Sequence, residues 1–180
     1  MRMRQRRWAV PVTLSLSLGL MSAGAMGAEN MRFHGALVAE PCTLAPGDES
    51  ILLEFGTVLE KYLYLNQRTH GKAFSLHLTG CDVRPGSGVT LTFSGVPNAA
   101  LPGLLALDAG SQGGGIAIGM ETPQGKPLPF NTTSELYPLA AGDNVVTLQA
   151  YVQGEPDALN QQRLRRGSFS AVATFSLAYP

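Results

Sequence analysis

Charged side chains are scarce in this sequence, because Lys, Arg, Asp and Glu together make up 14% of its 180 residues, against roughly 25% in ordinary soluble proteins. The 13 basic and 13 acidic residues cancel, so the net charge gives no reason to expect nucleic acid as a partner. Two cysteines are too few for a four-cysteine zinc site or a multi-disulfide scaffold. An apolar content of 44% nevertheless suffices for one folded core, which favours a single domain.

Motifs of the common secreted enzymes are also missing. The sequence has no GxSxG, no HExxH and no EF-hand loop. Its three histidines, His34, His70 and His77, lie in separate segments. A glycine run at residues 113–115 precedes a strand-like segment, whereas a phosphate cradle needs a helix there. We therefore expect no enzyme, no cofactor and no metal site.

The amino-terminal residues 1–27 have the layout of a secretory signal peptide. Four arginines lie within the first seven residues, residues 8–20 are apolar, and residues 22–27 are mostly small. The apolar run is shorter than the roughly 20 residues that span a bilayer, so we expect export and cleavage after Gly27, with no membrane insertion. Cleavage removes four basic residues and the single Trp, leaving a mildly acidic chain with nine basic and 13 acidic residues.

The two cysteines, Cys42 and Cys81, are expected to form a disulfide, because an exported protein folds in an oxidising compartment. The sequence has no CxxC motif, which disfavours a redox role. In the chain-entropy model, a disulfide that closes a loop of about 40 residues stabilises the folded chain by roughly 4 kcal/mol.

Downstream of Gly27 the apolar pattern has a period of two, which indicates strands. Short strand-like runs alternate with turns rich in Gly, Pro, Asn and Asp, as in an all-β sandwich or barrel. A long amphipathic helix is not evident, and residues 157–166 form at most a short turn. The strand-like runs are residues 51–58 with a mixed continuation at 62–64, then 73–81, 89–93, 116–118 and 144–152.

The last run is the most regular alternation in the sequence. A strand this long at the end of a chain needs a hydrogen-bonded neighbour on each side, or it is an exposed edge. It could also be an ordinary final core strand. Its apolar positions are Phe169, Ala171, Ala173, Phe175, Leu177 and Tyr179.

A second alternating segment lies before the first cysteine. A glycine in its apolar phase marks either a close approach of another backbone or a shallow pocket, and Pro41 then interrupts the pattern. An ordinary first strand that pairs within its own sandwich is the alternative. The apolar positions are Met31, Phe33, Gly35, Leu37 and Ala39.

Together these features resemble the chaperone–usher fimbrial (pilus) subunits, and among them the minor and adaptor subunits of P-type and type 1-type pili. Most specific is the carboxyl end, where Tyr179 is penultimate and Gly167 is fourteenth from the end. The other similar segments are residues 33–38 leading to Pro41 and Cys42, residues 78–81 closing on Cys81, and residues 90–95, 100–103 and 115–118.

The resemblance implies an incomplete immunoglobulin-like sandwich, a pilin domain at residues 41–180 that lacks its final strand. It further implies a groove beside the strand from Gly167 to Tyr179, and a donor-strand extension at residues 28–40 whose Gly35 fits a constricted part of a neighbour's groove. The implied partners are a periplasmic chaperone, an outer-membrane usher and neighbouring subunits in a head-to-tail polymer. The chain would pass through the periplasm to the cell-surface fimbrium and support adhesion there.

Two features depart from this picture or leave an alternative. The chain ends in Pro180, which cannot donate a backbone hydrogen bond at the last position of the groove strand. A self-contained secreted sandwich that binds a ligand or carbohydrate is the other interpretation, although the processed chain has no Trp to stack on a sugar. The arginines at 163, 165 and 166 are expected in a solvated loop.

Overall fold

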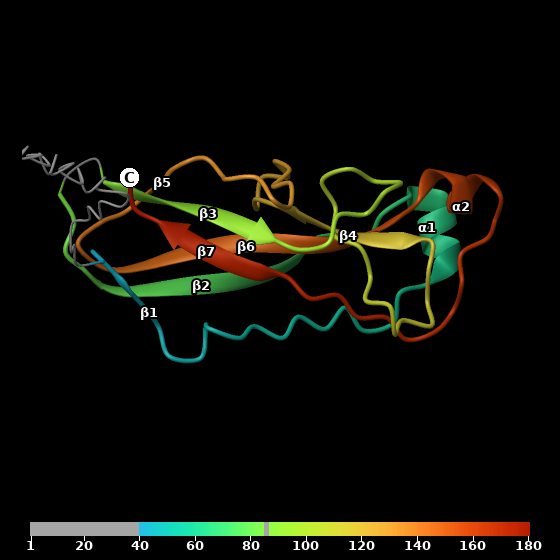
Figure 1. The fold of residues 1–180 in the computed structure, drawn as a ribbon, viewed down its shortest axis with the longest axis horizontal. Coiled ribbons are helices and arrows are strands. Elements are labelled where there is room, and N and C mark those ends of the chain that lie inside the picture. The colour runs from blue at the N-terminus through green and yellow to red at the C-terminus, as the bar shows by residue number, and fades with distance from the viewer. Residues whose placement is uncertain (1–39, 85–86) are drawn as a thin grey trace, which may run out of the picture. The chain divides into compact units, whose positions relative to one another are not determined.

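The computed structural model describes residues 40–84 and 87–180 (Figure 1). The expected export signal lies outside these residues. So do the five apolar positions of the predicted donor segment, Met31, Phe33, Gly35, Leu37 and Ala39.

Short antiparallel strands dominate the described residues, and two short helices interrupt them. The elements in chain order are β1 (Thr43–Leu44), α1 (Glu60–Asn66), β2 (Lys72–Cys81), β3 (Gly88–Ser94), β4 (Ile116–Glu121), β5 (Tyr137–Pro138), β6 (Gly142–Gly154), α2 (Pro156–Asn160) and β7 (Thr174–Ala178). Neither helix has the length and apolar content that a membrane crossing requires.

Two sheets face each other across the core. The four-stranded sheet has the order β1-β2-β6-β4, and the three-stranded sheet has the order β5-β3-β7 (Figure 1). All pairings are antiparallel; Ser75 lies opposite Thr147 between β2 and β6, and Phe93 lies opposite Phe175 between β3 and β7. This is the expected immunoglobulin-like sandwich.

Alternation in the sequence explains the core. Leu76 and Leu78 on β2 are fully buried, and Val89 and Leu91 on β3 are 0% and 1% exposed. The intervening positions of both strands are more exposed, as a period of two requires. The predicted inward faces of residues 73–81 and 89–93 are therefore confirmed.

The predicted disulfide is present between Cys42 and Cys81. Both cysteines belong to the core cluster, and Cys42 directly precedes β1 while Cys81 ends β2. The bridge therefore fixes the point where the described chain enters the sandwich.

Three sequence expectations need correction. Residues 62–64 belong to α1, because the good helix formers Glu60, Lys61 and Leu65 outweigh the aromatic residues between them. Residues 51–58 are not part of a sheet. In the last run only β7 has strand ladder pairing, and upstream of it Ser168 and Ser170 are instead bonded to a loop.

Candidate functional site

The strand β7 forms one edge of the three-stranded sheet, with β3 on its only paired side in the described structure. On β3, the backbones of Leu91 and Phe93 face away from β7, since their carbonyls accept hydrogen bonds from Ser134 and Asn131. The intervening residues of β3 therefore face β7, and the Thr90 hydroxyl donates to the Ala178 carbonyl at 3.3 Å. Residues 174, 176 and 178 consequently bond to β3, and the backbones of Phe175 and Leu177 point to the other side.

Upstream of β7 the same alternation continues against a loop. The Ser170 carbonyl accepts from Asp108 N–H at 2.8 Å, and the Ser168 carbonyl accepts from Gln112 N–H at 2.9 Å. In the residues that the structure describes, no backbone hydrogen bond involves Phe169, Ala171 or Ala173. Among residues 40–84 and 87–180, one side of the chain is thus without a backbone partner from residue 169 to residue 179.

The side chains on this unbonded phase are apolar and incompletely covered. They are packed against the core cluster while remaining partly exposed, and the Phe93 and Phe175 rings lie 6.1 Å apart between centroids. The partly buried members are Phe169, Ala171, Phe175, Leu177 and Tyr179, and Ala173 is exposed. Further apolar residues must cover these side chains before they are fully removed from water.

A second segment, residues 51–58, lies opposite. The rings of Phe55 and Phe169 are 6.3 Å apart between centroids, and Leu53 and Val58 also pack partly buried on the core. Gly56 has a φ of +67°, a left-handed conformation that interrupts a regular strand. Within residues 40–84 and 87–180, no backbone–backbone hydrogen bond joins this segment to another.

The turn before this segment is held by a polar contact. Asp48 accepts hydrogen bonds from the His77 backbone N–H at 2.5 Å and from its ring at 2.9 Å. The backbone bond is the main reason that the pKa of Asp48 lies below its ordinary value. This contact fixes the direction in which residues 51–58 leave β1.

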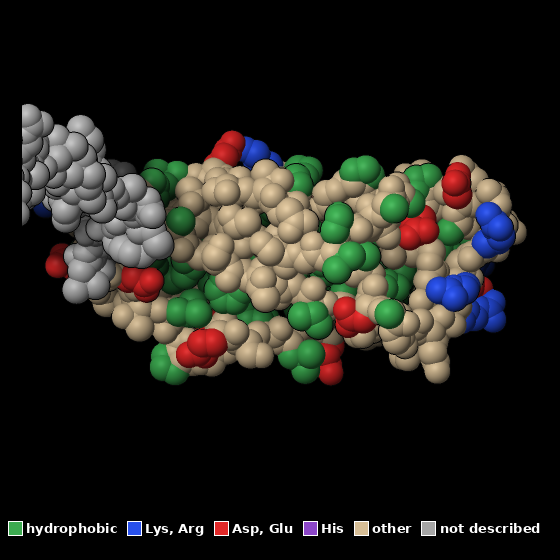
Figure 2. Space-filling model, in the orientation of Figure 1, with side chains coloured by type: hydrophobic (Ala, Val, Ile, Leu, Met, Phe, Trp, Pro, Cys, Tyr) green, Lys and Arg blue, Asp and Glu red, His purple; other side chains and the backbone are tan. Residues whose placement is uncertain are grey.

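We call residues 51–58, which no backbone–backbone hydrogen bond joins to another described segment, together with the odd-numbered residues from 169 to 179, the open edge. Figure 2 shows hydrophobic side chains at the surface over the strip where Figure 1 draws β7 and the segment that follows β1. Leu52 and Val172, one from each side, are 85% and 71% exposed. Chemically, the open edge offers main-chain donors and acceptors together with apolar side chains, which is what an added strand binds.

The residue that begins the carboxyl-terminal side of this edge is Gly167, with a φ of +140°. A Cβ there would lie 2.5 Å from the Gln112 Cβ and 3.0 Å from the Gly113 nitrogen. The glycine thus lets the chain pass close to the loop at residues 111–113.

Replacing this glycine is expected to destabilise the domain. The Gly167→Ala variant should lose about 2 kcal/mol of unfolding free energy in urea titrations, from backbone strain and overlap with the loop. Gly110→Ala is the matched control, because a Cβ at Gly110 meets nothing within 4 Å. Equal stability of the two variants would contradict a conformational requirement at Gly167.

The carboxyl end of the open edge lies near the point where the described chain begins. Burial raises the pKa of the Tyr179 phenol, and the nearby Glu40 carboxylate adds to the shift. Asp82 N–H donates to the Pro41 carbonyl at 2.7 Å. The two ends of the described chain therefore meet at one end of the sandwich (Figure 1).

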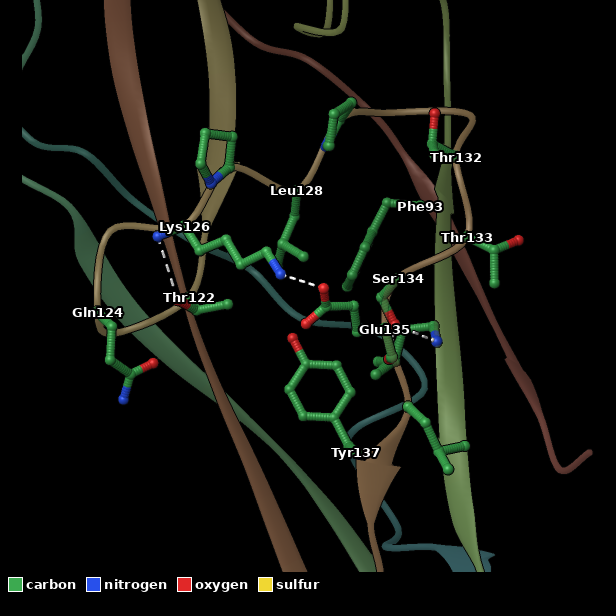
Figure 3. A pocket seen from close by; sticks show the side chains of 14 residues that line it. Phe93, Thr122, Gln124, Lys126, Leu128, Thr132, Thr133, Ser134, Glu135 and Tyr137 are labelled. Atoms are coloured by element: carbon green, nitrogen blue, oxygen red, sulfur yellow. Dashed lines mark hydrogen bonds and ion pairs between the residues drawn. The ribbon is translucent and has the colours of Figure 1, made fainter.

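A cavity of about 410 Å³ lies elsewhere, beyond β3 and beneath residues 122–137. Figure 3 shows Lys126 reaching Glu135 across it, with Phe93 and Leu128 beside it and the Tyr137 ring below. The two opposite charges neutralise each other at the surface, and the residues lining the cavity include no His or Cys. It offers no nucleophile activated by a base.

The structure therefore brings together the predicted groove residues from Gly167 to Tyr179 along one unbonded edge. The opposite flank, Leu53, Phe55 and Val58, was recognised in the sequence only as a strand-like run. Its signal was present, because apolar residues recur at alternate positions from Ile51 to Phe55. The alternation alone does not indicate which other segment of the chain residues 51–58 pack against.

Comparison with known proteins gives consistent results. A family model described as fimbrial protein matches residues 31–180. The Fimbria A protein of Serratia marcescens is 30% identical over 160 residues, which is 89% of both chains. The fimbrial adapter PapK of Escherichia coli is 30% identical over 172 residues, covering 91% of this chain and 95% of its own. The crystal structure of the P pilus rod subunit PapA superposes with a TM-score of 0.66 at 23% identity, covering 78% of this chain and all of PapA.

Proposed function

The chain belongs to the fimbrial protein family, and from this premise we propose that it polymerises by donor-strand exchange. It is a structural subunit of the cell-surface fimbrium and not an enzyme. In the proposed mechanism the open edge of one subunit receives residues 28–40 of the next. The observation that carries the proposal is the row of odd-numbered residues from 169 to 179, which have no backbone partner in the described part of the chain and whose apolar side chains are mostly half-buried.

An inserted strand supplies both things that the open edge lacks, which are backbone hydrogen-bond partners and a cover for its apolar side chains. Its main chain pairs with the odd-numbered residues of β7, and its alternate side chains cover the apolar row. At roughly 3.3 Å per residue, the predicted donor segment from Met31 to Ala39 is long enough to run along most of residues 169–179. Each large apolar side chain buried this way contributes about 1.5–3 kcal/mol.

The same edge requires protection before assembly. An exposed strand with apolar neighbours pairs with any available strand, which is the usual origin of aggregation. We therefore assign a periplasmic chaperone that lends a strand, and an outer-membrane usher at which the donor segment replaces it. Export through the periplasm follows from the expected signal at residues 1–27.

Within the fimbrium we assign the chain to a minor or adaptor position. The adaptor relative supports this, and so do residues 90–95 and 100–103, which resemble adaptor subunits. Subunit counting in isolated fibres tests the position, because a minor subunit is present at a small fraction of the main subunit. Equal abundance with the main subunit would overturn it.

The role of the donor segment is tested at Gly35. Gly35→Leu should reduce incorporation of this chain behind the preceding subunit at least tenfold, because a side chain is added where the preceding subunit's groove is constricted. The measurement is fibre yield from cells that express the chain with its chaperone and usher. Ala36→Leu is the matched control, since residue 36 lies on the opposite phase of the strand and should leave the yield within twofold.

The level of folded, disulfide-bonded chain provides the second readout. It should be unchanged in both variants, because the donor segment serves a neighbour. A parallel loss of folded chain and fibre in Gly35→Leu would show that residues 31–39 form an internal first strand.

A further inference from the structure

Basic residues gather at the end of the sandwich that carries α1 and α2 (Figure 2). Half of the Lys and Arg residues in the described ranges are here, and all are exposed. We call this group the basic end: Lys61, Arg163, Arg165 and Arg166.

The backbone of residues 163–166 is firmly placed. Arg163 N–H donates to the Ala158 carbonyl on α2 at 2.8 Å, and Leu164 N–H donates to the Tyr64 hydroxyl on α1 at 3.2 Å. Arg165 N–H donates to the Gly114 carbonyl at 3.0 Å. These three hydrogen bonds hold the loop that carries the arginines against α1, α2 and Gly114.

Local acidic residues do not neutralise the basic end. Glu60 pairs with Arg166, whose Nε lies 2.9 Å from its Oε2. Glu155 is half-buried and accepts a hydrogen bond from Asn98 at 2.8 Å. Asp157 is the remaining exposed carboxylate on α2.

The opposite end of the sandwich is acidic. Glu40, Asp82 and Asp143 are exposed there, and the exposed Arg84 follows Asp82 by two residues. Asp82 is held against Pro41, and the Asp143 carboxylate accepts from Gly80 N–H at 3.2 Å. We call Glu40, Asp82 and Asp143 the acidic end.

Both ends lie at functional positions of the chain. Arg166 directly precedes Gly167, where the carboxyl-terminal side of the open edge begins. We call this position the mouth of the open edge, and the basic end lies beside it. Glu40 is the last residue of the predicted donor extension, so the acidic end lies where that extension meets the sandwich. A donor strand inserted antiparallel to β7 leaves the acceptor at this mouth, which brings the acidic end of the donor subunit to the basic end of the acceptor. A parallel insertion would instead bring two acidic ends together, which is repulsive.

We propose that, where two copies of this chain are neighbours in the fimbrium, the basic end of one docks on the acidic end of the other, and that this contact sets the direction of donor-strand insertion. The inference rests on the proposed function. Opposite charges at the rim of an interface mainly speed correct encounter and reject the wrong orientation. The contact is therefore expected to be sensitive to salt.

Charge reversal on either side tests this contact. The chain from residue 28 onward is assembled in vitro in 20 mM and in 300 mM NaCl, and polymer growth is followed by light scattering. Arg163→Glu/Arg165→Glu and, separately, Asp82→Lys/Asp143→Lys, two acidic-end residues outside the donor extension, should each slow growth about tenfold at low salt. A chain carrying all four changes should recover to within threefold of the original rate. Lys126→Glu, a reversal on a side surface already occupied by an ion pair, is the control and should leave the rate unchanged.

Uptake of a synthetic peptide of residues 28–40 separates this inference from the proposed function. Each variant should bind the peptide as the original chain does, because the open edge is unaltered. Equal growth rates in all variants would overturn the docking proposal, as would a fourfold variant slower than either double variant. Peptide uptake without any self-assembly of the unchanged chain would exclude a second copy as the partner, whereas absence of peptide uptake would refute donor-strand exchange itself.

Discussion

Appending residues 28–40 behind Pro180 through a short Gly/Ser linker is expected to raise the unfolding free energy of the domain by about 5 kcal/mol or more. The appended strand folds back antiparallel to β7 and fills the open edge within one molecule. Met31, Phe33 and Leu37 each contribute about 1.5–3 kcal/mol on burial. New ladder hydrogen bonds form with residues whose backbones are otherwise unbonded, and the linker keeps the closure entropy small.

Urea unfolding of the chain from residue 41, with and without the appended strand, measures this effect. The matched control carries Phe33→Ser and Leu37→Ser in the appended strand, so that linker and length are unchanged. It should lose most of the gain. A gain of the same size in the control would mean that the segment acts without inserting its apolar side chains.

Removal of the disulfide is expected to have the next largest effect. Cys42→Ser/Cys81→Ser should lower the unfolding free energy by about 4 kcal/mol, because the bridge closes a loop between cysteines 39 residues apart. The comparison is made in the chain with the appended strand, whose greater stability leaves a measurable folded population. A loss below about 1 kcal/mol would show that the bridge constrains the unfolded chain very little.

The core of the fold could be predicted because burial imposes a period of two. Phe74, Leu76 and Leu78 on β2 share the inner face with Val89 and Leu91 on β3, and that pattern depends only on residues within one strand. Pairing of Cys42 with Cys81 could likewise be predicted from the compartment and the absence of other cysteines. Neither inference required knowledge of which strands are neighbours.

The open edge was only partly predictable. The row from Phe169 to Tyr179 reads as one strand, yet its first half is bonded to the loop at residues 108–113, which has no sequence signal of its own. Gly56 interrupts the opposite flank through a positive φ, and this is invisible in a pattern of apolar residues. The helix at residues 60–66 was missed because two tyrosines in a short apolar run are as typical of a strand.

Charge placement was the least predictable feature. Separated by long stretches of sequence, Glu40, Asp82 and Asp143 are brought together by the β1–β2 and β2–β6 pairings. Arg163, Arg165 and Arg166 read as a solvated loop, which they are. Their position at the mouth of the open edge depends on the whole sandwich.

Hydrogen exchange of individual backbone amides in β7 tests the central claim most directly. In the chain from residue 41, the amides of Thr174, Ser176 and Ala178 already face β3, whereas those of Phe175 and Leu177 face the open edge. Adding a peptide of residues 28–40 should slow exchange at Phe175 and Leu177 by at least a hundredfold and change the even-numbered positions much less. Slow exchange at Phe175 and Leu177 before the peptide is added, or no change after it, would contradict the proposal that the open edge is unpaired until a neighbouring subunit inserts its strand.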